Sequence, residues 1–165
     1  MILLENFRAI HDPFDTQRKI IGIDTFSGYK GFEKGESIDP TIQENSYSLD
    51  DGYEIKLQKL VNLQEKANGK TSGLHKVIKG DAVSKLSTIL ADEGSSPVAL
   101  SFFDMNAFVP TRDCLETIIP RLITGSMLAS GNFQDLKYLE KDVLLRIVNR
   151  NFPYIKCLNL NIIPP

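Results

Sequence analysis

Three aspartates stand at the ends of short apolar runs, where a parallel sheet would present them along one edge. They are Asp24, Asp81 and Asp104. The carboxyl ends of parallel strands meet at the edge where open α/β sheets hold their ligands. A carboxylate there can accept hydrogen bonds from ribose hydroxyls or bind a hard cation such as Mg²⁺. We therefore expect one ligand crevice at these three residues, although each aspartate taken alone could instead cap a helix.

The elements that must position these aspartates alternate along the chain. Short apolar runs predict strands, and apolar residues at helical spacing predict helices between them. The expected strands cover residues 19–23, 76–79, 97–103, 126–130 and 154–160, and the expected helices cover residues 2–10, 53–64, 82–90, 111–122 and 134–149. Strands that alternate with helices favour right-handed crossovers and a mostly parallel sheet between helical layers. The predicted fold class is therefore α/β.

Two of these elements carry more specific expectations. The run 97–103 is nearly continuous in apolar character, which is typical of a strand covered on both faces by helices. The core phenylalanines that we expect are Phe102, Phe103, Phe108 and Phe133. For the helix 111–122, Pro110 suits the first turn and Gly125 suits the stop.

Composition limits the kind of protein. The 165 residues make about one domain, and 42% apolar with 24% charged residues is a normal globular mixture. Nineteen Lys and Arg against 21 Asp and Glu give a net charge of −2, which disfavours a nucleic-acid binder. No apolar run reaches the roughly 20 residues of a membrane span, and Cys114 and Cys157 are expected to be reduced, buried thiols. We expect a soluble, cytoplasmic protein without nucleic-acid or membrane partners.

Several sequence blocks resemble those of one enzyme family. RKIIGIDTFSGY at 18–29, IKGDA at 78–82 and ALSFFDMNAFVPTRDCLE at 99–116 look like the S-adenosylmethionine-dependent sugar O-methyltransferases of the macrocin type, including deoxyhexose 3-O-methyltransferases. The likeness continues through 119–126, with the blocks in family order, and covers roughly residues 5 to 130. The combination of blocks is much more specific than any block alone.

This resemblance implies a class I methyltransferase fold, which is a Rossmann-like sheet with helices on both faces. It also implies S-adenosylmethionine as the cofactor, often Mg²⁺ at a carboxylate cluster, and a small-molecule sugar or nucleotide-sugar as the acceptor. The residues carried over are Asp24 for the cofactor ribose, Thr25 and Phe26 beside it, Asp81 with Ala82 near the adenine, and Asp104 as a metal ligand.

The chain also departs from the family pattern. Met1 already lies in a predicted helix, so residues 1–165 are expected to form a single truncated domain that lacks the usual first strand and glycine-rich turn. Asn106 occupies the position of the general base, and an amide cannot accept a proton from a hydroxyl near neutral pH. Phe108 replaces a tyrosine, while Gly131 and Asn132 replace acidic metal ligands. Mg²⁺ binding is therefore expected to be weakened.

These departures leave two functions open. The first is methyl transfer to a sugar hydroxyl, with the activity of the isolated chain in doubt. The second is a non-catalytic binding or assembly subunit that pairs with a complete methyltransferase or with a separately encoded N-terminal segment. Under either function an unpaired strand edge invites association, so we expect a homo-oligomer or a partner methyltransferase chain. His11 and His75 have no neighbours at metal-ligand spacing, and we expect them in surface or capping roles.

Overall fold

The computed structural model describes residues 1–28, 46–105 and 107–130, and these residues divide into two compact units. The first unit comprises Met1–Gly28 and Tyr47–Ala82. The second comprises Ser46 and the described residues from Val83 onward.

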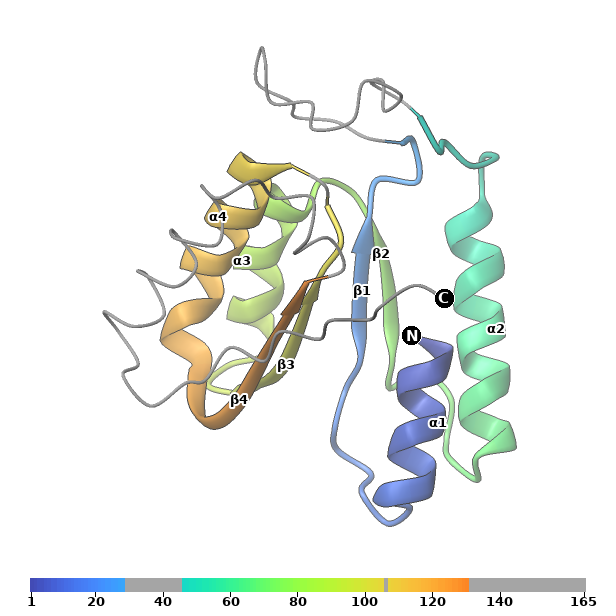
Figure 1. Ribbon diagram of the computed structural model, residues 1–165. Coiled ribbons are helices and arrows are strands. Elements are labelled where there is room, and N and C mark those ends of the chain that lie inside the picture. Colours follow the sequence, from blue (N-terminus) through green and yellow to red (C-terminus); the bar gives the residue numbers. More distant parts are fainter. Residues whose placement is uncertain (29–45, 106, 131–165) are drawn as a thin grey trace, which may run out of the picture. The chain divides into compact units, whose positions relative to one another are not determined.

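The first unit is a β-α-β arrangement with one additional helix (Figure 1). The helix α1, Ile2–His11, precedes strand β1, Ile21–Asp24. Helix α2, Tyr53–Ala67, connects β1 to strand β2, Lys76–Lys79. The two strands pair in parallel, from Ile21 beside Lys76 to Asp24 beside Lys79. All four elements are confirmed close to their predicted bounds, and the parallel pairing is confirmed with them.

Helix α2 packs against β2 and also supplies a side chain to the edge of that strand. Val61 and Glu65 are its buried residues, whereas Leu60, next to Val61 in the sequence, is half exposed. The amide of Gln58 donates to the carbonyl of His75 at 3.0 Å and accepts from the N–H of Val77 at 2.7 Å. The Gln58 side chain thus takes the backbone hydrogen bonds that a further strand would take.

The second unit contains a second parallel strand pair with a helical connection. Its elements are helix α3, Ala82–Asp92, strand β3, Val98–Phe103, helix α4, Phe108–Ile118, a 3₁₀ turn, Ile119–Arg121, and strand β4, Leu122–Ser130. Strands β3 and β4 pair in parallel. A set of buried apolar residues forms the core of this unit: Phe103, Ala107, Cys114, Leu115, Ile118 and Leu122.

The boundary between α4 and β4 differs from the prediction. The α-helix begins at Phe108, three residues before the predicted start. It ends at Ile118, because Pro120 has no N–H with which to continue the helical hydrogen bonds. Strand β4 then begins at Leu122, four residues before the predicted start at Ser126. Gly125 therefore lies within a strand, where its φ of 94° favours glycine, and does not end the helix.

An irregularity in β4 explains why the sequence pattern missed its first half. The register shifts between Val98, which lies beside Leu122, and Leu100, which lies beside Met127. The hydroxyl of Ser126 spans this bulge, donating to the carbonyl of Val98 at 2.7 Å and accepting from the N–H of Ile123 at 2.9 Å. The residues in the bulge break the period-2 pattern by which a strand is recognised.

The expectation that β3 is covered on both faces stays a prediction, because the helix predicted at 134–149 lies outside the described residues. Phe103 is buried as predicted, but Phe102 is 60% exposed, because successive residues of a strand point to opposite faces. Leu100 and Met127, which pair across the strands, are also exposed. Cys114 is a buried free thiol, as predicted. Cys157, Phe133 and the elements predicted at 134–149 and 154–160 lie outside the described residues, and nothing is described of the Phe108 side chain.

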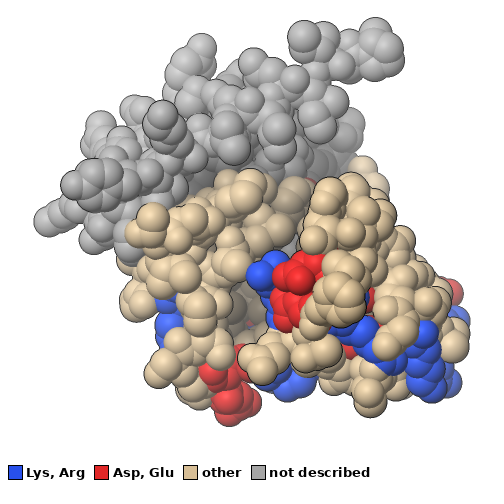
Figure 2. All heavy atoms as spheres, turned by 90° about the horizontal axis from the view of Figure 1, so that it is seen from below, with Lys and Arg blue, Asp and Glu red and all other residues tan. Residues whose placement is uncertain are grey.

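Among the described residues, no helix has the length and apolar character needed to cross a membrane. The face shown in Figure 2 carries lysines and arginines beside aspartates and glutamates. Charge of both signs on this face is consistent with the near balance of charge in the sequence.

Candidate functional site

The predicted cofactor residues Asp24, Thr25 and Phe26 form a tight turn directly after β1. Oδ1 of Asp24 accepts the N–H of Phe26 at 2.6 Å, and the Thr25 hydroxyl donates to the Gly28 carbonyl at 2.9 Å. Phe26 has a left-handed φ of 55°, and its buried ring lies against Tyr53 with the centroids 6.2 Å apart. Phe26 and Thr25 therefore hold the turn, and the Asp24 side chain remains exposed at the strand end.

Asp81 lies at the same edge of this strand pair as Asp24. Asp24 pairs with Lys79, and its carbonyl accepts the N–H of Gly80 at 2.9 Å, so the parallel ladder extends to the residue before Asp81. Asp81 is exposed, and Ala82 after it begins α3. The structure thus brings Asp24 and Asp81 to one carboxyl edge, as the sequence predicts.

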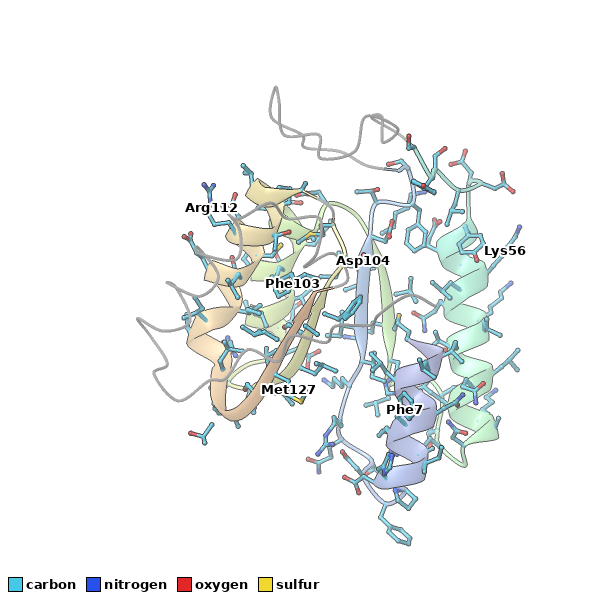
Figure 3. The ribbon with its side chains drawn as sticks, in the orientation of Figure 1. Phe7, Lys56, Phe103, Asp104, Arg112 and Met127 are labelled. Atoms are coloured by element: carbon cyan, nitrogen blue, oxygen red, sulfur yellow. The ribbon has the colours of Figure 1, made fainter. Side chains whose placement is uncertain are left out.

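Asp104 belongs to the second unit, where it follows the last residue of β3 and is exposed (Figure 3). It therefore stands at a strand end, which is the local position that the sequence predicts. Asn106, at the predicted general-base position, lies outside the described residues. The common crevice of all three aspartates stays a prediction.

The described residues do not supply a magnesium site. Within residues 1–28, 46–105 and 107–130, no three His, Cys, Asp or Glu side chains are grouped as metal ligands. Asp104 alone is a weak donor set for a hard divalent cation, which needs several oxygen ligands.

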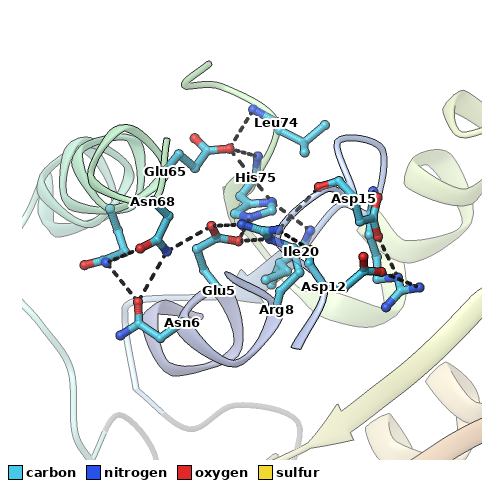
Figure 4. Close-up of polar contacts among 12 residues, drawn as sticks. Glu5, Asn6, Arg8, Asp12, Asp15, Ile20, Glu65, Asn68, Leu74 and His75 are labelled. Atoms are coloured by element: carbon cyan, nitrogen blue, oxygen red, sulfur yellow. Dashed lines mark hydrogen bonds and ion pairs between the residues drawn. The ribbon is translucent and has the colours of Figure 1, made fainter. Parts of the chain in front are cut away.

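A buried polar cluster, which the sequence did not predict, lies in the first unit (Figure 4). Its members are Glu5, Arg8, Glu65, Asn68 and His75. Glu5 and Arg8 form a two-point ion pair at 2.6 and 2.7 Å, and Asn68 donates to Glu5 at 3.1 Å. The hydrogen bonds from Arg8 are the largest cause that lowers the pKa of Glu5 to about 2, against the opposing effect of burial. The same pair raises the pKa of Arg8.

His75 connects this ion pair to the strands. Its Nδ1 accepts the N–H of Ile20 at 3.1 Å, so the ring proton must be on Nε2, which lies 2.8 Å from Oε2 of Glu5. His75 is therefore a neutral donor to Glu5 in this arrangement. The expectation of a surface or capping role for His75 is wrong, because the ring is buried.

Glu65 binds the backbone that leads into β2. Its carboxylate accepts the N–H groups of Gly73, Leu74 and His75 at 2.7 to 3.0 Å. Every member of the cluster thus makes a hydrogen bond within the chain, and the arrangement fixes α1, α2 and the start of β2 together. The cluster is structural, because the charges of Glu5 and Arg8 pair with each other and the buried carboxylate of Glu65 binds three backbone N–H groups.

Comparisons with known proteins support the fold. No protein-family model matches the chain, and no curated protein matches it significantly. Among solved structures, one described as CalS11, a calicheamicin methyltransferase, matches with a TM-score of 0.83 and 23% identity over 99% of this chain and 64% of that chain. The apo structure of CalS11, described as a TDP-rhamnose 3'-O-methyltransferase in calicheamicin biosynthesis, matches with a TM-score of 0.71 and 22% identity over 99% and 62% of the two chains.

The chain therefore has an α/β, Rossmann-like methyltransferase fold. It spans less than two thirds of the length of either solved structure, and identity at this level shows the fold alone.

Proposed function

We propose that this chain is an S-adenosylmethionine-dependent O-methyltransferase-like protein whose acceptor is a hydroxyl of a sugar or nucleotide-sugar, most simply a deoxysugar. The observation that carries the proposal is the similarity to CalS11 over 99% of this chain at a TM-score of 0.83. The sequence blocks at 18–29, 78–82 and 99–116 support the same class independently.

Exposed carboxylates at the strand ends fit the cofactor. Asp24 would accept hydrogen bonds from the ribose hydroxyls, while Asp81 and Ala82 would lie near the adenine. Thr25 and Phe26 support Asp24 by holding the turn through the Thr25–Gly28 hydrogen bond and the Phe26–Tyr53 contact. S-adenosylmethionine supplies an electrophilic methyl group on its sulfonium.

The residues that would activate the acceptor hydroxyl are less complete than those that would bind the cofactor. A hydroxyl must lose its proton as it attacks, and the amide of Asn106 cannot take that proton. Among the described residues, no three possible metal ligands are grouped, so the carboxylates there do not fit Mg²⁺. We therefore expect cofactor binding by the isolated chain with little or no turnover.

The lack of a proton acceptor at Asn106 and of a grouped set of metal ligands among the described residues favours a second candidate function. The chain would be a non-catalytic binding or assembly subunit that pairs with a complete methyltransferase or with a separately encoded N-terminal segment. The predicted cytoplasmic location is shared by both candidates.

Calorimetric titration with S-adenosylmethionine tests the proposal. We expect binding by the whole chain, at least about tenfold weaker binding after Asp24→Ala because a charged hydrogen-bond acceptor is lost, and unchanged binding after Asp92→Ala, which removes an exposed carboxylate from the end of α3. Absence of binding by the unmodified chain contradicts the cofactor role. Methylation of a TDP-deoxysugar by the isolated chain, detected by mass spectrometry, would contradict the non-catalytic candidate.

A further inference from the structure

The turn after β1 holds one of the two carboxylate oxygens of Asp24. Its Oδ1 accepts the N–H of Phe26 at 2.6 Å, whereas its Oδ2 accepts no hydrogen bond from the described residues. The Asp24 side chain is exposed at the end of the strand. One oxygen therefore fixes the carboxylate to the turn, and the other remains for a hydroxyl donor.

This arrangement requires an unfavourable backbone at Phe26. Its φ of 55° lies in the left-handed region, which a residue with a Cβ atom rarely adopts. Strand β1 fixes the chain on one side of the turn, so a change at Phe26 would move the N–H that Asp24 accepts. Contacts from outside the turn must therefore hold Phe26 in this conformation.

The segment that leads into α2 supplies these contacts. The N–H of Leu49 donates to the carbonyl of Phe26 at 3.1 Å, and Ser48 forms an antiparallel bridge with Ser27. The buried Phe26 ring has its centroid 6.2 Å from that of Tyr53, with 41° between the ring planes. This tilted geometry lies within the range that favours aromatic pairs. The Tyr53 ring is thus the side-chain contact that holds the Phe26 ring.

Tyr53 is itself well placed to hold that ring, because it is the first residue of α2. Its N–H donates to the carbonyl of Asp50 at 3.1 Å, which closes the turn before the helix. Further along α2, Gln58 bonds to the backbone of His75 and Val77. Helix α2 is therefore fixed to the same strand pair whose end carries Asp24.

We propose that Tyr53 is a positioning residue for the cofactor, which fixes the Asp24 carboxylate toward the ribose hydroxyls by holding Phe26 in its left-handed conformation. Tyr53 acts through Phe26 and without touching the cofactor. A carboxylate that is already held loses less conformational freedom when a ligand binds, so the hydrogen bonds to the ligand gain in strength. The role in cofactor binding rests on the proposed function, whereas the role in holding the turn does not.

Amide hydrogen exchange of the whole chain, followed by NMR without ligand, tests the role in the turn. Tyr53→Ala should make the Phe26 amide exchange about three- to tenfold faster, because its hydrogen bond to Asp24 opens more often. Tyr53→Phe keeps the ring and should exchange like the unmodified chain. Ile55→Ala is the matched control, since Ile55 is exposed on the same helix and contacts neither ring. Tyr53→Leu, which lacks a ring but keeps apolar bulk, serves if Tyr53→Ala does not fold.

Calorimetric titration of the same variants with S-adenosylmethionine tests the role in binding. Tyr53→Ala should raise the dissociation constant about three- to tenfold, while Tyr53→Phe and Ile55→Ala leave it unchanged. In a chain that already carries Asp24→Ala, the further change Tyr53→Ala should have no effect, because Tyr53 acts through that carboxylate. A general loss of stability would instead weaken binding by the same factor with and without Asp24.

Three results would overturn the proposal. The first is an unchanged exchange rate of the Phe26 amide in Tyr53→Ala. The second is an unchanged dissociation constant in the same variant. The third is an equal effect of Tyr53→Ala with and without Asp24. If the unmodified chain does not bind S-adenosylmethionine, the proposed function fails and the cofactor role of Tyr53 fails with it. The exchange rates distinguish that failure from a failure of Tyr53 to hold the turn.

Discussion

Nε2 of His75 lies 2.8 Å from Oε2 of Glu5, and this hydrogen bond joins α1 to the residue immediately before β2. The two residues are 70 positions apart in the sequence. Because Ile20 donates to the other ring nitrogen of His75, the same ring also holds the chain that enters β1. One buried side chain thereby aligns the two strands whose ends carry Asp24 and Asp81.

Replacement of Glu5 should destabilise the protein strongly. In Glu5→Gln the guanidinium of Arg8 stays buried without its counter-charge, so we expect a loss of about 3–5 kcal/mol in the free energy of unfolding. Urea denaturation measures the loss. Glu116→Gln, at an exposed position of α4, is the control and should change stability by less than about 0.5 kcal/mol. Equal effects of the two changes would show that the buried pair does not hold α1.

Acid should remove the same stabilisation. The pKa of Glu5 falls from an ordinary value of 4.5 to about 2 in the folded chain. The unfolded chain therefore binds a proton first as the pH falls. The contribution of Glu5, on the order of 3 kcal/mol, is complete above pH 4.5, decreases between pH 4.5 and 2, and is absent below pH 2. The difference in unfolding free energy between the unmodified chain and Glu5→Gln should narrow over this range. A difference that is constant with pH would contradict this account.

The sequence predicts the elements better than it predicts the polar cluster. Apolar periodicity identifies α1 and α2, because local spacing alone determines it. It does not show that Glu5 and Arg8 face inward on α1, since that choice depends on His75 and Asn68, which other segments supply. No spacing rule connects residues so far apart. The sequence pattern thus predicts that α1 is a helix, but it does not predict which side of the helix is buried.

The sequence likewise predicts some features of the candidate site and not others. The strand ends at Asp24 and Asp81 follow from apolar runs, and the structure places both at one edge. The sequence does not predict the structural roles of Thr25 and Phe26 in the turn, because these roles depend on the left-handed backbone of Phe26 and on its contact with the Tyr53 ring. In β4, the bulge interrupts the alternation of apolar and polar residues, so the sequence pattern does not predict the first residues of the strand.

Removal of the hydroxyl that spans this bulge should weaken the β3–β4 pair. Ser126 is buried, and Ser126→Ala leaves the Val98 carbonyl and the Ile123 N–H without this partner. We expect a loss of about 1–3 kcal/mol in unfolding free energy. Ser87→Ala, at an exposed position of α3, should be nearly neutral. If thermal denaturation shows the two alanine variants to be equally stable, the hydroxyl does not support the register shift.

Gln58 offers a test of how the edge of β2 is protected. Its amide bonds to His75 and Val77 as a neighbouring strand would, so Gln58→Leu keeps the volume but leaves the donor of Val77 and the acceptor of His75 without this partner. We expect a loss of about 1 kcal/mol in unfolding free energy and faster aggregation, because an uncovered edge can pair with another chain. Gln58→Glu keeps an oxygen that can accept from Val77 and should therefore lose less stability than Gln58→Leu. Light scattering during incubation, together with urea denaturation, measures both effects. Should the leucine variant stay as soluble and as stable as the unmodified chain, the side-chain amide would not be what protects this edge.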